Sequence, residues 1–226
     1  MGYINLSNEY LTSKKMVNRF QLNLDAQNIE KKFNKILFYQ DELLHLCDRF
    51  ILFTIEEIYE MFDELKKETF NQKAFLEEFS DIILYLFSFS IELEKENIKL
   101  YMDYKIDLKN IKLYDNINFK SYFEIKNESL VPTYNFNSDS FPNDFSMISL
   151  IEELLELRKY FPSRKYHRNK ELLETKNVLN EIQNKVRNLI EITINNFYSY
   201  FNNREEADTA LYLLLKVLRE KQESFI

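Results

Sequence analysis

The chain has 226 residues, of which 45% are hydrophobic and 30% charged, a composition typical of a globular protein that is long enough to bury a core. It contains one glycine and three prolines, which excludes the glycine-rich phosphate loops of P-loop and Rossmann proteins and disfavours sheets with many tight turns. The net charge of −7 gives the chain no overall attraction to nucleic acid or to anionic lipid, so we expect neither as a partner.

Cysteine usage and the distribution of apolar residues indicate the compartment. The single cysteine, Cys47, allows no internal disulfide. The N-terminal residues lack the continuous apolar stretch of a signal peptide, and the longest strongly apolar run, Ile82–Phe87, is too short to cross a membrane. We therefore expect a cytoplasmic protein.

Helical periodicity dominates the first part of the chain. Residues 26–68 carry it together with good helix formers, either as one bent helix or as two helices joined near residues 48–54. A break is expected at 68–72. A second helix, over residues 72–97, is apolar on nearly all sides between 82 and 87, which is typical of the middle helix of a bundle.

Residues 101–145 have a different character. The segments 104–108 and 118–125 alternate polar and apolar side chains, which predicts a short hairpin or an irregular excursion. Residues 131–144 have the composition of a loop. This part of the chain is therefore predicted to be a non-helical insertion.

The last part of the chain returns to helical periodicity. A helix is expected to start near Phe145, with Ser146 as its cap, and two more helices fit residues 165–201 and 205–224. The fold predicted for residues 1–226 is a single all-α domain, a bundle of four or five helices interrupted by the insertion.

Three glutamates share one face of the first predicted helix. Glu57, Glu60 and Glu64 are spaced at i, i+3 and i+7, and the same face carries Phe53 and Met61. Acids and hydrophobes therefore interleave on this face, whereas on a solvated helix they segregate.

A second acidic pair, Glu78 and Asp81, stands at i and i+3 on the next helix, directly before the apolar run. Two buried acidic pairs brought together repel each other, which raises their pKa values or requires a cation. Mg²⁺ meets that requirement, because it prefers oxygen ligands and takes a few carboxylates. A single pair of this kind is usually solvated, and Glu205 and Asp208 repeat the spacing where a helix N-terminus alone favours acids.

In their order and helical context, Glu57-Ile-Tyr-Glu60 and Glu78-Phe-Ser-Asp81 resemble the paired motif of the all-α NTP pyrophosphatase superfamily, which includes MazG and the dimeric dUTPases. The resemblance covers residues 51–94. It implies a bundle of the MazG and dimeric dUTPase type, in which these four acids bind Mg²⁺, or Mn²⁺ in its place, between two antiparallel helices.

The resemblance also implies a reaction and an assembly. Water activated by the metal would attack the α-phosphorus of a nucleoside triphosphate and release pyrophosphate and a nucleoside monophosphate, with Glu57 or Glu60 orienting or deprotonating that water. Family members pair helices across a dimer or a dimer of dimers, so a homodimer or homotetramer is expected.

Further residues are candidates for substrate binding. Asp63-Glu64 resembles a pair found in dimeric dUTPases, which implicates Glu64. The tryptophan-containing segment of those dUTPases is missing, because the chain has no tryptophan, so the base is not assigned. Gln40, on the helix before the acids, is a candidate for reading a base edge, with an ordinary surface glutamine as the alternative.

The phosphates of such a substrate need cations beyond the metal. The densest basic stretch runs from Arg158 to Lys170, and its side chains either reach the phosphates or form a solvated helix junction. The candidates for phosphate binding are Arg164, Lys165, Arg168 and Lys170.

Two other functions are compatible with the sequence. Glu42 and His45 form one E-x-x-H pair of the kind found in di-iron bundles, but such sites need two pairs and the chain has only one. The second alternative is a non-catalytic helical interaction or regulatory protein whose acidic site is degenerate.

Overall fold

The computed structural model describes residues 3–16, 42–95, 105–107, 122–133, 145–160, 176–201 and 203–224. Helices account for 80% of these residues, so the chain is mostly helical, as predicted. The helices are a segment over residues 7–16, α2 (Glu42–Lys66), α3 (Gln72–Lys95), α4 (Phe145–Arg158), α6 (Lys176–Ser199) and α7 (Arg204–Ser224). The strands are β1 (Tyr3–Asn5), β2 (Lys105–Asp107), β3 (Phe123–Lys126) and β4 (Ser129–Pro132).

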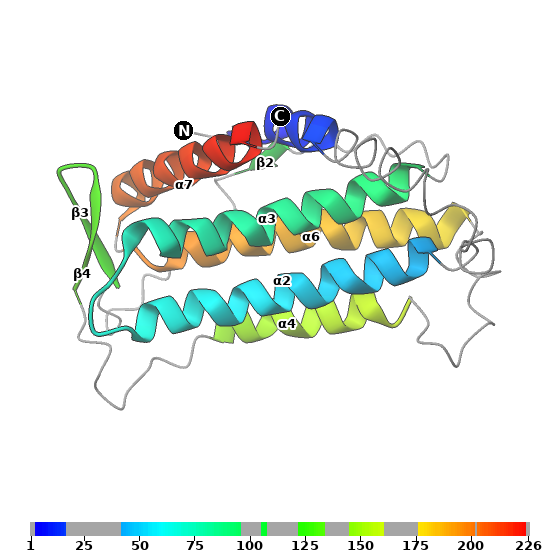
Figure 1. The fold of residues 1–226 in the computed structure, drawn as a ribbon, viewed down its shortest axis with the longest axis horizontal. Helices are drawn as coiled ribbons and strands as arrows, with labels where there is room; N and C mark the ends of the chain where they lie inside the picture. The colour runs from blue at the N-terminus through cyan, green and yellow to red at the C-terminus, as the bar shows by residue number, and fades with distance from the viewer. Residues whose placement is uncertain are drawn as a thin grey trace, which may run out of the picture.

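Four long helices form a ring of neighbours (Figure 1). α2 and α3 lie side by side and run in opposite directions, α3 packs against α6, α6 against α4, and α4 against α2. α7 lies outside this ring along α3 and α6, and the helix over residues 7–16 lies beside the last turns of α7. None of the described helices is long and apolar enough to cross a membrane.

Asparagine side chains cap α3 and α7. The Asn71 Oδ1 accepts hydrogen bonds from the backbone N–H groups of Lys73 at 3.1 Å and Ala74 at 3.3 Å, which fixes the start of α3. The Asn203 Oδ1 does the same for Glu206 at the start of α7, at 2.9 Å. The predicted break at 68–72 is confirmed, since α2 ends before it and α3 begins within it.

Some predicted boundaries were wrong or are confirmed only in part. Of the two alternatives for residues 26–68, the described part is a single helix, because α2 passes through residues 48–54 without a break. α4 already begins at Phe145, which places Ser146 inside its first turn and not at its cap. The predicted helix over residues 165–201 is confirmed from 176 to 199, while residues 26–41 and 165–175 lie outside the described chain.

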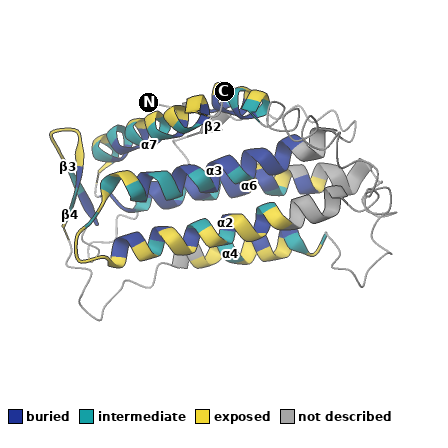
Figure 2. Cartoon of the chain, viewed as in Figure 1, coloured by how far each residue is buried: buried dark blue, intermediate teal, exposed yellow. Residues whose placement is uncertain are grey.

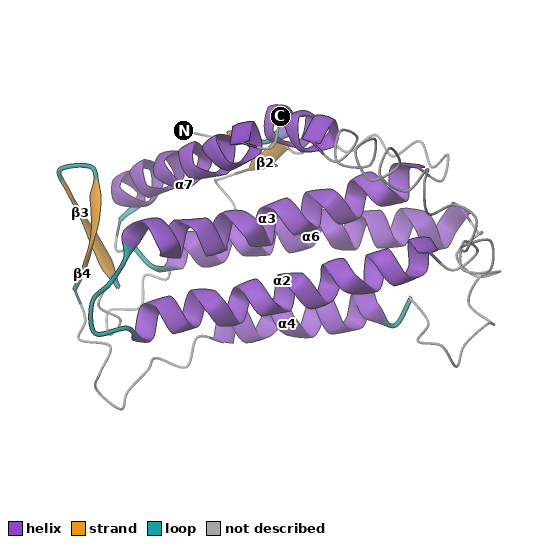
Figure 3. Cartoon of the chain, in the orientation of Figure 1, coloured by secondary structure: helices purple, strands orange, loops and turns teal. Residues whose placement is uncertain are grey.

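The predicted insertion contains a hairpin at one end of the bundle (Figure 3). β3 and β4 pair in antiparallel register, Phe123 with Pro132, so the first residues of the predicted loop belong to a strand. The hairpin turn places Asn127 and Glu128 at φ 51° and 60°, as tight hairpin turns require. The pairing of β1 with β2 was not predicted, because it joins segments far apart in the sequence.

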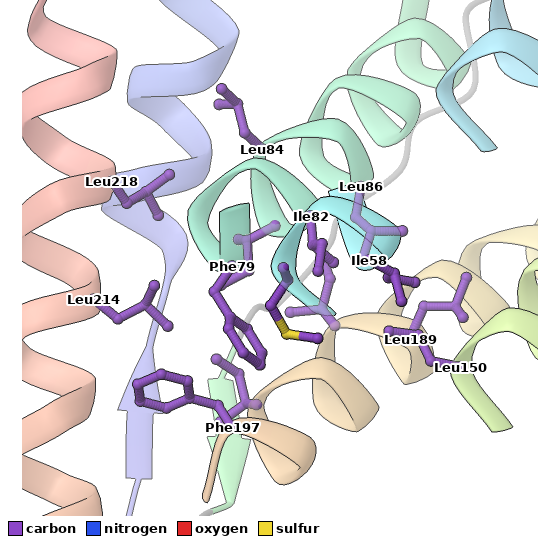
Figure 4. Close-up of a cluster of buried hydrophobic side chains, with 14 of the residues drawn as sticks. Ile58, Phe79, Ile82, Leu84, Leu86, Leu150, Leu189, Phe197, Leu214 and Leu218 are labelled. Atoms are coloured by element: carbon purple, nitrogen blue, oxygen red, sulfur yellow. The ribbon is translucent and has the colours of Figure 1, made fainter. Parts of the chain in front are cut away.

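The core is rich in aromatic side chains (Figure 4). The Phe79 ring lies with its centroid 5.0 Å from that of Phe197 and 5.3 Å from that of Phe75, both in edge-to-face arrangements. The run from Ile82 to Phe87 is buried except at Tyr85, which is only half-buried. Figure 2 shows that most of the described part of α3 is buried. α3 is therefore the central helix that its apolar sequence predicted, and α2 is fixed against it.

Candidate metal centre

Two stripes of side chains meet along the contact between α2 and α3. On α2 the stripe contains Phe53, Glu57 and Glu60, which lie one helical turn apart in succession. On α3 the stripe contains Asp81 and Tyr85, four residues apart, after Glu78 at the preceding turn. Both stripes flank the buried face of their helix, so their side chains lie between the core and solvent.

Three carboxylates from the two helices converge in this contact. One oxygen each of Glu57, Glu60 and Glu78 lies within 4.8 Å of the other two. Glu57 and Glu78 are half-buried and share a hydrogen bond in which the Glu57 carboxyl donates to the Glu78 carboxylate, whereas Glu60 is exposed. Neighbouring ligand oxygens of an octahedral Mg²⁺ lie about 3 Å apart, so a small shift of these side chains would fit one cation.

Burial and the closeness of the acidic groups raise the pKa values of two carboxyl groups in the cluster. Burial, followed by the hydrogen bond to Glu78 and the charge of Asp81, raises the pKa of Glu57 to about 8. Burial also raises the pKa of Glu78 above its ordinary value. Near neutral pH and without a cation, the two carboxyl groups therefore hold a proton between them, and a divalent cation would replace that proton.

Asp81, the fourth predicted ligand, is paired with a lysine. The Lys221 ammonium, from α7, donates a hydrogen bond to the Asp81 carboxylate. Burial nevertheless raises the pKa of Asp81, and its charge in turn raises the pKa values of Glu57 and Glu78, which places it close to the cluster. Of the four predicted ligands, the fold thus brings three together and holds the fourth beside them in an ion pair.

The remaining residues of the predicted acidic face on α2 take no part in the cluster. The Glu64 carboxylate is buried, and one of its oxygens accepts a hydrogen bond from Lys67 while the other has no partner among the described residues. Met61 is fully buried in the core, where its sulfur accepts a 4.0 Å contact from the Tyr200 hydroxyl. Of the two hydrophobic residues expected on this face, only Phe53 lies beside the acids.

Several predicted residues fall outside the described chain. The described part of the basic stretch ends after Lys159, which pairs with Glu156, and Tyr160. The side chains of Glu42 and His45 are likewise outside it, although α2 includes both positions. The predicted substrate-binding residues that lie outside are Gln40, Arg164, Lys165, Arg168 and Lys170.

Two residues of the site were not predicted from the sequence. Tyr85 is four residues after Asp81, so helical spacing could have placed it in the stripe. Burial, and then the charges of Glu57 and Asp81, raise its pKa to about 12. Lys221 is 140 residues from Asp81 in the sequence, and no local pattern connects them.

The sequence and the structure were compared with known proteins. No protein-family model, curated protein or solved structure matches this chain.

Glu57 is predicted to make the stability of the metal-free protein depend on pH. Because its pKa is higher in the folded chain than in the unfolded chain, the folded state binds more protons between about pH 4.5 and 8. In the presence of a chelator, the free energy of unfolding should fall as pH rises through that range, and Glu57→Gln should flatten the fall. Urea unfolding at several pH values measures both slopes. A wild-type slope equal to that of Glu57→Gln would contradict this assignment.

Lys221 is predicted to weaken metal binding in the absence of substrate. Its ammonium competes for Asp81 and adds positive charge next to the acids, so Lys221→Gln should bind Mg²⁺ several-fold more tightly in isothermal titration calorimetry. Lys216→Gln, on the exposed side of the same helix, is the matched control and should leave the affinity unchanged. An unchanged or weaker affinity in Lys221→Gln would show that the ion pair does not oppose the metal.

Proposed function

We propose that the protein is a Mg²⁺-dependent nucleoside triphosphate pyrophosphohydrolase with a bundle of the MazG and dimeric dUTPase type. The observation that carries the proposal is the convergence of Glu57, Glu60 and Glu78 across an antiparallel helix pair. The order of the two acidic motifs along the chain resembles that superfamily, and the helical ring of α2, α3, α6 and α4 is compatible with its fold.

The environment of these acids supports the proposal that they form a metal site and are not ordinary charged residues on a solvated surface. Burial and neighbouring charges, those of Asp81 and Glu78 for Glu57 and those of Glu60 and Asp81 for Glu78, raise the pKa values of these half-buried carboxyl groups, which costs free energy that a divalent cation would recover. The similarly spaced pair at the start of α7 differs. Glu205 is exposed there, and the Asp208 carboxylate accepts a 2.7 Å hydrogen bond from the Tyr198 hydroxyl.

Each acid has a role in this proposal. Glu60 and Glu78 would hold the cation together with Asp81, which is paired with Lys221 in the structure. The bound Mg²⁺ would lower the pKa of water and neutralise charge on the phosphates. Glu57, which lies beside these ligands and would lose its proton when the cation binds, would then be a carboxylate suited to accept a proton from the attacking water.

Lys221 supplies the positive charge that the phosphates need near the acids. With Asp81 bound to a cation, the ammonium would be available to contact phosphate oxygens. Lys221 would thus stabilise the empty site through Asp81 and the substrate complex through the phosphates. This role is independent of the predicted basic residues between Arg164 and Lys170.

A second copy of the chain is the expected partner. Leu52 and Tyr59 on α2, and Ile148 and Leu155 on α4, are exposed hydrophobic residues, and each pair is seven residues apart and so lies on one side of its helix. Since α2 and α4 are neighbours, these residues can form one apolar surface that a second copy would cover. Light scattering at micromolar concentration should give a dimer or a tetramer, and a monomer would contradict this assembly.

The activity is predicted to release pyrophosphate and to need the clustered acids. With a panel of ribo- and deoxyribonucleoside triphosphates and Mg²⁺, at least one should yield pyrophosphate and the monophosphate, and chelation of the metal should abolish the reaction. Glu57→Gln and Glu78→Gln should each lower kcat/KM by about 100-fold or more. Glu205→Gln, which changes the other acidic pair, is the control and should retain full activity. Release of orthophosphate, or no reaction with any nucleotide, would refute the proposal.

A further inference from the structure

An aromatic pair borders the acidic cluster on one side. Phe53 lies one helical turn before Glu57 on α2, and Tyr85 lies one turn after Asp81 on α3. The two ring centroids are 5.4 Å apart and the ring planes are tilted by 37°. The Phe50 ring, 6.3 Å from that of Tyr85, lies next to them and is half-buried.

The aromatic pair lies close enough to the acids for their charges to act on the Tyr85 hydroxyl. The Tyr85 hydroxyl experiences the charges of Glu57 and Asp81, and also that of Glu60. Phe53 shares its helical stripe with Glu57, so both side chains leave α2 in nearly the same direction. A molecule bound at the three glutamates therefore has these two rings as its immediate neighbours.

Phe53 also remains accessible to such a molecule. Its side chain is 37% exposed, whereas the aromatic residues that hold the bundle together, such as Phe75 and Phe79, are fully buried. Leu52 and Tyr59 are exposed as well, but they lie on the side of α2 that faces away from the acidic stripe. Among the exposed hydrophobic residues that the structure describes on α2, from residue 49 onward, Phe53 is thus the one that borders the cluster.

The spacing suits a nucleotide. Four residues of helix rise by about 6 Å, which separates the rings from the carboxylates along the helix axes. In a nucleoside triphosphate one sugar ring separates the α-phosphate from the base, a span of similar size. With its phosphates at the acids, a nucleotide directed towards the start of α2 would place its base on the exposed edge of the aromatic pair.

We propose that Phe53 and Tyr85 form a stacking platform for the base of the nucleotide whose phosphates lie at Glu57, Glu60 and Glu78. This inference rests on the proposed function. It adds that the protein recognises the base of the nucleotide. Every base has a flat π-face, so stacking accepts purines and pyrimidines alike. The site should therefore prefer nucleotides over polyphosphates that carry no base.

The absence of tryptophan from the chain allows a direct test of stacking. Phe53→Trp introduces a single fluorescent indole at the platform. The probes are adenosine and uridine triphosphates with an imido group between the α- and β-phosphorus, which cannot be cleaved there, and inorganic tripolyphosphate, all with Mg²⁺. Both nucleotides should quench the fluorescence and tripolyphosphate should not. Tyr212→Trp, at an exposed position on α7, is the matched control and should respond to none of them.

A smaller change measures the contribution of the ring to affinity. Phe53→Leu should weaken binding of both nucleotide analogues by about 5- to 100-fold in calorimetry and leave the affinity for tripolyphosphate unchanged. Tyr212→Leu should change neither affinity. This variant also tests the inference if Phe53→Trp does not fold.

The outcomes separate this inference from the proposed function. If the wild-type protein releases pyrophosphate from nucleotides but Phe53→Leu binds them as tightly as the wild type, the platform is refuted and the function stands. Equal quenching of Phe53→Trp by tripolyphosphate and by the nucleotides would also refute it. If the wild-type protein neither binds nor hydrolyses any nucleotide, both proposals fail together.

Discussion

Repulsion between carboxylates at the contact of α2 and α3 is the interaction on which the site depends. The hydrophobic effect drives these two helices together, because Ile58 on α2 and Phe79 on α3 are fully buried in the core that both helices share. The same packing draws Glu57 and Glu78 partly out of water and brings them within hydrogen-bonding distance of each other. The core thus imposes an electrostatic cost at its edge, and a bound cation would relieve it.

In the absence of a cation, two features reduce that repulsion: a proton shared by Glu57 and Glu78, and the ammonium of Lys221 on Asp81. The second depends on the contact between the helix over residues 7–16 and the last turns of α7, which lie side by side (Figure 1). The Arg219 guanidinium donates a 2.9 Å hydrogen bond to the buried Glu9 carboxylate, and the Gln222 side chain donates one of 2.8 Å to the Glu9 carbonyl. The N-terminal helix therefore anchors the turn of α7 that presents Lys221 to the acids.

The sequence predicted the features of this site that arise within single helices. Spacing placed Glu57 and Glu60 on one face, and the polar break before α3 coincides with the Asn71 cap, because both follow from local geometry. Contacts between distant segments were missed. Neither the pairing of Lys221 with Asp81 nor that of β1 with β2 leaves a local pattern, since each depends on how the whole bundle packs. The binding of metal and nucleotide remains a prediction.

The most direct test of the central claim is to locate a divalent cation in crystals of the protein. Mn²⁺ takes the oxygen ligands that Mg²⁺ takes and scatters anomalously, so diffraction data collected at the manganese absorption edge reveal its position. We expect one or more anomalous peaks bounded by the carboxylates of Glu57, Glu60 and Glu78. Crystals grown with millimolar Mn²⁺ that show no peak between α2 and α3, with these side chains directed into solvent, would contradict it.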